Sequence, residues 1–129
     1  MSKKVVMLVL CRRVITELLI ETIEKHSDMK AIGVYGINEA RSAAVFNRPS
    51  IALVEIHEKH DSPVQEALDL CKEVTGVAPG CKTVILCPEA DKASVQACIE
   101  AKRHGKIDDF LFYDSSTDYL ISKLESLYP

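Results

Sequence analysis

Four side chains that can do chemistry stand at the ends of apolar segments: Cys11, Glu55, Cys87 and Tyr113. The two thiols, together with His57, are ligand types that suit Zn²⁺ in a tetrahedral site. The same thiols could instead carry out redox chemistry, or they could simply be small core residues. Glu55 is an acid in an apolar setting, where a carboxylate needs hydrogen-bond donors.

Two arginines are candidate partners for Glu55. Arg12 and Arg13 directly follow the first apolar segment, and a guanidinium can hold a carboxylate through two parallel N–H···O bonds. Tyr113 is the other candidate donor, but it offers only a neutral hydroxyl. On grounds of charge, we expect Arg12 to be the main partner of Glu55.

The elements that must position these residues are strands. Apolar runs of strand length cover residues 5–10, 31–35, 51–56, 83–86 and 110–112. Runs this apolar indicate burial on both faces, as in a parallel sheet covered by helices. Because ligands of such sheets bind beyond the carboxyl ends of the strands, function is expected where these runs end.

Helical patterns fill the segments between the runs. In the first, Val14 and Leu18 belong to an apolar stripe at spacings of three and four. In the second, Asn38 is expected to cap the helix and Phe46 to face inward. Asp91 is expected to open the fourth helix. Strict alternation of strand and helix predicts a doubly wound α/β fold.

Composition excludes several classes of function. The 129 residues suit one domain, residues 1–129, and a net charge of −3 gives no support for direct binding to nucleic acid. No segment resembles a signal peptide or a membrane span, so no membrane contact is expected. The odd number of cysteines without a C-x-x-C pair indicates reduced thiols and a cytoplasmic location. They are Cys11, Cys71, Cys81, Cys87 and Cys98.

Four stretches, taken in order, carry a family resemblance: residues 24–33, 38–40, 48–56 and 108–111. Their sequences and spacing resemble receiver domains of bacterial response regulators (CheY-like), above all receivers that precede helix-turn-helix output domains. The resemblance implies a flavodoxin-like fold with a five-stranded parallel sheet in the order 2-1-3-4-5. It also implies a role in signal transduction, either as a free-standing domain or as the front part of a transcriptional regulator.

The resemblance also shows which chemistry is missing. Receivers transfer a phosphoryl group to an Asp with the help of a metal-binding acidic pair, a Ser or Thr, and a Lys. At these positions the chain has Leu10 and Cys11 for the acidic pair, Glu55 for the Asp, Cys87 for the Ser or Thr, and Tyr113 for the Lys. One carboxylate is a poor Mg²⁺ site, and phosphoryl transfer depends on cations. We therefore expect a pseudo-receiver with no catalytic activity, no metal and no cofactor.

Two further expectations follow from the resemblance. Phe110 occupies the position of the aromatic residue that switches rotamer in receivers, and here it is expected to stay inside. Glu55 is either a satisfied structural acid or a fixed imitation of the phosphorylated state, and both interpretations remain open.

The main functional hypothesis is an interaction module. Receivers commonly dimerise through helix 4, strand 5 and helix 5, so a homodimer or a protein partner is expected on that face. A plain solvated face is the alternative. Mixed charges and small residues there suit reciprocal packing: Lys92, Ala93, Ala97, Glu100, Ala101, Lys102, Arg103 and Asp118.

A second hypothesis is a small flavodoxin-like enzyme, or a cofactor- or metal-binding protein that uses the pocket at the strand ends. It has less support, because the segment Cys11-Arg12-Arg13-Val14 contains no glycine for a phosphate-binding loop.

Overall fold

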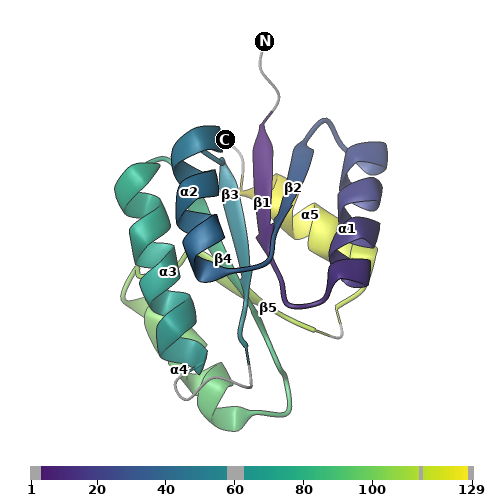
Figure 1. Ribbon diagram of the computed structural model, residues 1–129. Coiled ribbons are helices and arrows are strands. Elements are labelled where there is room, and N and C mark those ends of the chain that lie inside the picture. The colour runs from purple at the N-terminus through teal and green to yellow at the C-terminus, as the bar shows by residue number, and fades with distance from the viewer. Residues whose placement is uncertain (1–3, 58–62, 114, 128–129) are drawn as a thin grey trace.

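The sheet is parallel and has five strands in the order β2-β1-β3-β4-β5, as predicted (Figure 1). The computed structural model describes residues 4–57, 63–113 and 115–127. Each strand begins and ends within one residue of the predicted run. The strands are β1 (Val5–Val9), β2 (Lys30–Val34), β3 (Ile51–Glu55), β4 (Lys82–Cys87) and β5 (Asp109–Phe112).

Five helices cover the two faces of this sheet (Figure 1). They are α1 (Arg13–His26), α2 (Ile37–Asn47), α3 (Pro63–Val77), α4 (Lys92–Arg103) and α5 (Thr117–Ser126). Residues of α2, α3 and α4 pack into one apolar core, and residues of α1 and α5 pack into the other. The fold is therefore the doubly wound, flavodoxin-like α/β architecture. None of the helices within the described residues is long and apolar enough to cross a membrane.

The strand register brings the candidate residues to one edge of the sheet. Val9 of β1 lies opposite Val34 of β2 and Val54 of β3. The next residues along these strands therefore emerge side by side at the carboxyl edge. They are Leu10, Tyr35 and Glu55.

Helix α1 turns a different face to the sheet than its sequence predicts. Val14 is 78% exposed, and Leu18 also faces solvent. The buried side includes Ile23, which belongs to the predicted stripe, and Thr16, which does not. Thr16 tolerates burial because its hydroxyl donates a hydrogen bond to the Arg12 carbonyl at 2.8 Å. A polar residue whose hydroxyl is hydrogen-bonded within its own helix thus occupies a position where an apolar residue was expected.

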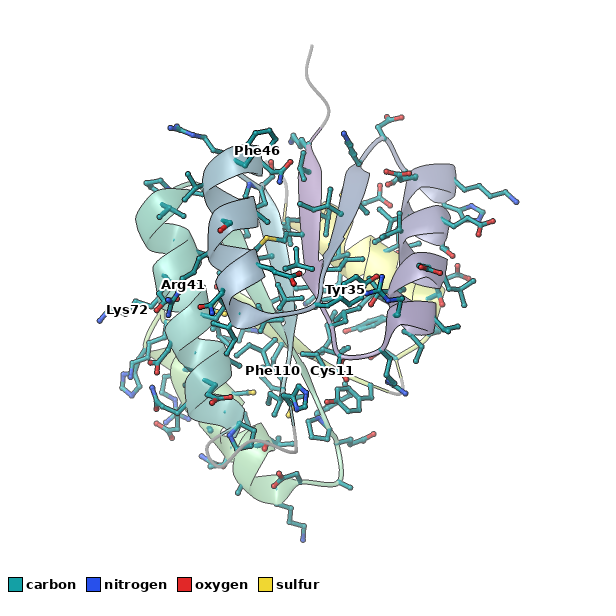
Figure 2. All side chains as sticks on the ribbon, viewed as in Figure 1. Cys11, Tyr35, Arg41, Phe46, Lys72 and Phe110 are labelled. Carbon is teal, nitrogen blue, oxygen red and sulfur yellow. The ribbon has the colours of Figure 1, made fainter. Side chains whose placement is uncertain are left out.

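Helix α2 also differs in detail. It begins two residues earlier than an Asn38 cap would require, with Gly36 as the N-cap residue. Phe46 is 89% exposed and points away from the sheet (Figure 2). The inward positions are filled by Ala40 and Ala44, whose small side chains allow the helix to lie close to the sheet. The predicted Asp91 cap of α4 is confirmed, since its carboxylate accepts from the Ser94 N–H.

All five cysteines are free thiols, as expected. Cys11 is exposed, whereas the other four are buried. Burial raises the pKa of Cys71, of Cys81 and of Cys98 to about 12. These thiols stay protonated at neutral pH and are poor nucleophiles.

Candidate functional site

Glu55 ends β3 at the carboxyl edge, and only 7% of its side chain is exposed. Its Oε1 accepts a hydrogen bond from the Cys11 backbone N–H at 2.9 Å. The Cys11 thiol also lies close enough to this carboxylate to interact with it. The predicted bidentate contact with Arg12 is wrong, because Arg12 Nη2 lies 4.0 Å from Oε2 and forms an ion pair only. The main partner of Glu55 is therefore the chain just after β1.

Arg13 is not a partner of Glu55, contrary to prediction. Its guanidinium lies over the Tyr35 ring, 4.2 Å from the ring centroid, which is a cation–π contact. Gly33 leaves room for this arrangement, since a Cβ there would come within 3.2 Å of the Tyr35 hydroxyl and 2.8 Å of Thr16 Cγ2. The contact joins the start of α1 to the end of β2. Sequence reasoning gave Tyr35 no role.

The chemistry of the Cys11 thiol is set by its surroundings. Although Cys11 is exposed as a residue, partial desolvation of its thiol and the negative charge of Glu55 raise the pKa of Cys11 to about 11. A metal-binding or redox-active cysteine needs the opposite, a lowered pKa that populates the thiolate. The raised pKa therefore disfavours redox or nucleophilic chemistry at Cys11.

Tyr113 directly follows β5, at the same carboxyl edge of the sheet as Glu55. Its hydroxyl donates a hydrogen bond to the Ile56 carbonyl at 2.8 Å, and its backbone N–H donates to the Cys87 carbonyl at 3.2 Å. A phenol has a single O–H, so this hydroxyl cannot also donate to Glu55. The expected Tyr113–Glu55 contact is wrong. Tyr113 instead ties the end of β5 to the end of β3.

Cys87 is buried inside the fold, and Phe110 is half-buried against the same apolar core. Cys87 is fully buried, and its thiol contacts the Pro88 carbonyl at 3.6 Å and the Cys98 thiol. Phe110 packs against the same core, with its ring edge-on to Phe112 at 5.9 Å between centroids. Cys87 therefore faces α4, and Phe110 lies inward as expected.

A cavity of about 290 Å³ opens at the carboxyl edge between β1, β3, the first turn of α2 and α3. Of the five predicted pocket residues, Leu10, Cys11 and Glu55 line it, while Cys87 and Tyr113 do not. Sequence reasoning missed the α2 and α3 walls. No group of three or more His, Cys, Asp or Glu residues in the described ranges is arranged to hold a metal ion.

Comparison with known proteins gives a match in structure but not in sequence. No protein-family model matches the chain, and no curated protein matches it. A response regulator from Thermotoga maritima superposes with a TM-score of 0.77 at 18% identity, covering 98% of each chain. A LuxR-family DNA-binding response regulator from Staphylococcus aureus gives 0.74 at 11% identity, covering 96% of this chain and 98% of that one. The chain has the fold of a response-regulator receiver domain.

Other receiver-fold structures match over similar lengths. A response regulator receiver protein from Pseudomonas putida superposes with a TM-score of 0.76 at 18% identity, covering 98% of each chain. Glu55 ends β3 and Tyr113 directly follows β5, both at the carboxyl edge of the sheet. Their side chains are bonded to Cys11 and to the Ile56 carbonyl.

A second charged cluster lies at the opposite, amino edge of the sheet. Asp109 begins β5, and only 9% of its side chain is exposed. Its carboxylate accepts from Lys102 at 3.0 Å, from Lys123 at 2.7 Å and from the Phe110 N–H at 2.8 Å. We call Asp109, Lys102 and Lys123 the Asp109 clamp. Burial alone would raise the pKa of Asp109, but the hydrogen bonds from both lysines outweigh it and lower the pKa.

The Asp109 clamp corrects two expectations about the face formed by α4, β5 and α5. Lys102 is engaged with Asp109 rather than held ready for a partner. Ala101 is a core residue and not part of the surface. The clamp joins all three elements of the face. Sequence reasoning did not single out Asp109 as a buried charge.

Proposed function

We propose that this chain is a signal-transduction receiver module that works by binding other proteins, without phosphoryl transfer. The observation that carries the proposal is the bond from the Tyr113 hydroxyl to the Ile56 carbonyl. It commits the side chain at the family's lysine position to the protein's own backbone. Phosphoryl transfer relies on cations that neutralise the developing charge, and neither a lysine nor an acidic pair stands at the matched positions.

The interaction face in this proposal is α4–β5–α5. Ile99 of α4 is 36% exposed and Tyr119 of α5 is 54% exposed. Aliphatic and aromatic anchors within a polar rim are typical of protein interfaces. The Asp109 clamp fixes the three elements relative to one another, so little ordering is needed on binding.

The setting of the module is part of the same proposal. The likeness to receivers of DNA-binding regulators supports a place in a cytoplasmic transcriptional regulator. With a net charge of −3, the chain gives no general attraction to phosphates. In this proposal DNA is contacted by another domain, while this one receives or relays the signal.

The interface is tested by paired variants on exposed apolar side chains. Ile99→Lys and Tyr119→Ala change the proposed face, and Phe46→Ser is the matched control on α2, away from it. Self-association is measured by sedimentation equilibrium, and partner capture by pull-down from cells of the source organism. We expect association to be lost in the two face variants and kept in Phe46→Ser. Equal behaviour of all three variants would contradict the proposed face.

A further inference from the structure

The cavity at the carboxyl edge has walls of three different chemical kinds. Its volume of about 290 Å³ is at the lower end of the range for small-molecule sites. A ligand that fits must therefore be small. The cavity is separate from the α4–β5–α5 face, so what it binds does not depend on that interface.

One wall is the carboxylate of Glu55. This side chain is more than nine-tenths buried, yet its contacts among the described residues are the Cys11 N–H, the Cys11 thiol and Arg12 at 4.0 Å. An ionised carboxylate has about four lone-pair sites, so acceptor capacity remains at the cavity wall. Glu66 of α3 lines the same cavity and adds a second acid. This side of the cavity suits a group with several N–H donors and a positive charge.

The wall formed by α2 has the opposite polarity. Gly36, Ile37 and Asn38, the N-cap and first two residues of α2, line the cavity. Gly36 has no side chain with which to cap the helix. The first N–H groups of a helix have no intrahelical partner, and the helix dipole makes this end partly positive. This wall suits a small anionic group such as a carboxylate.

The third wall is apolar. It contains side chains from β1, β3 and α3 that give no hydrogen bonds and offer van der Waals contact only. The apolar residues of this wall are Val9, Val54, Ala67 and Leu70.

We propose that the cavity binds a small zwitterion, an α-amino acid with an apolar side chain. Its ammonium group pairs with Glu55, its carboxylate bonds to the first turn of α2, and its side chain packs on the apolar wall. A simple anion is disfavoured because Glu55 and Glu66 repel it. A simple cation leaves the α2 N–H groups without an acceptor. Binding would couple the end of β3 to α2, which gives the receiver fold a ligand-dependent input in place of phosphorylation.

A panel of related ligands tests the class of molecule on the unmodified protein. L-leucine and L-phenylalanine are titrated by isothermal calorimetry, beside N-acetyl-leucine, which lacks the ammonium charge, and leucinamide, which lacks the carboxylate. We expect at least one free amino acid to bind and each blocked analogue to bind about ten-fold to a hundred-fold more weakly. No binding of either amino acid up to about 10 mM would overturn the proposal. Equal binding of a blocked analogue would overturn the zwitterion.

Variants then test the place of binding. Glu55→Gln removes the charge that faces the ammonium group, and Ala67→Leu fills part of the cavity. Glu125→Gln, on the exposed side of α5, is the matched control. We expect binding of the amino acid found in the panel to weaken about ten-fold or more in the first two variants and to be unchanged in the control. Retention of affinity by both cavity variants, each shown to be folded by circular dichroism, would overturn this site.

Discussion

Two buried carboxylates lie at opposite edges of the same sheet and differ in how fully they are hydrogen-bonded. Glu55 at the carboxyl edge and Asp109 at the amino edge are almost equally buried, with 7% and 9% of their side chains exposed. Asp109 is held by two lysines and a backbone N–H at 3.0 Å or less. Glu55 has one backbone N–H, a thiol and an arginine at 4.0 Å.

The difference is the one expected between a charge that holds elements together and a charge that can take a ligand. A buried charge that is fully hydrogen-bonded holds elements together, which is what the Asp109 clamp does for α4, β5 and α5. A buried charge with acceptor capacity left over, beside a cavity, is available to a ligand. The carboxyl edge is also the edge where ligands of parallel α/β sheets bind.

The largest expected effect comes from breaking the Asp109 clamp. Asp109→Asn removes the charge from two lysine contacts, and we expect the free energy of unfolding to fall by about 2–3 kcal/mol. Urea unfolding at neutral pH measures this. Asp28→Asn, on an exposed loop, is the control and should change stability little. A loss for Asp109→Asn no larger than the control's would show that the clamp contributes nothing.

The Asp109 clamp also predicts a pH dependence. Because the pKa of Asp109 is lowered from its ordinary value of 3.8, the clamp contributes its full stability above that value. The contribution is lost as the pH falls through the lower, folded-state pKa. The stability gap between wild type and Asp109→Asn should therefore be widest at neutral pH and should close in acid. A gap that is constant from pH 7 to about pH 2 would contradict the lowered pKa.

A smaller effect is expected at the Tyr113 bond. Tyr113→Phe keeps the ring but leaves the Ile56 carbonyl without its hydroxyl donor, which we expect to cost about 1 kcal/mol. Tyr119→Phe removes an exposed hydroxyl from α5 and is the control. If both variants unfold at the same denaturant concentration as wild type, Tyr113 does not tie β5 to β3 in solution.

The smallest effect is expected at Glu55. In Glu55→Gln the amide oxygen can still accept from the Cys11 N–H, and Arg12 is too far away for a hydrogen bond, so the loss should be below about 1 kcal/mol. Arg12→Ala, measured beside it, should cost no more than about 0.5 kcal/mol. A loss at Glu55 as large as that at Asp109 would remove the distinction between the two edges.

Much of the fold is readable in the sequence because its signals are local and redundant. Continuous apolar runs predict the strands within a residue, and their alternation with helices predicts the doubly wound α/β class. The strand order followed from the resemblance to receiver domains. The errors lie where tertiary packing decides the face of a helix. Val14 and Phe46 face solvent because smaller side chains fill the inward positions of their helices. Thr16 is buried in α1, and Ala40 and Ala44 are buried in α2.

The sequence predicts where the candidate site lies, at the carboxyl ends of the strands, but it does not predict the hydrogen bonds within the site. Residue types identify Glu55 as an acid that needs hydrogen-bond donors. They do not identify a backbone donor such as the Cys11 N–H, because almost every residue carries one. The Asp109 clamp was missed for a different reason. An acid at the start of an apolar strand indicates a buried charge that needs partners. Its partners, Lys102 and Lys123, come from two helices, and only the structure shows how these helices lie relative to β5.

The most direct test of the central claim, a receiver fold without phosphoryl chemistry, uses beryllofluoride with Mg²⁺, which imitates a phosphoryl group in receivers. Amide spectra of the ¹⁵N-labelled protein are recorded with and without the two reagents. Because the matched positions offer one carboxylate and no lysine, we predict unchanged signals throughout. Beryllofluoride-dependent shifts of the amides of Cys11, Glu55 and Phe110 would contradict the account.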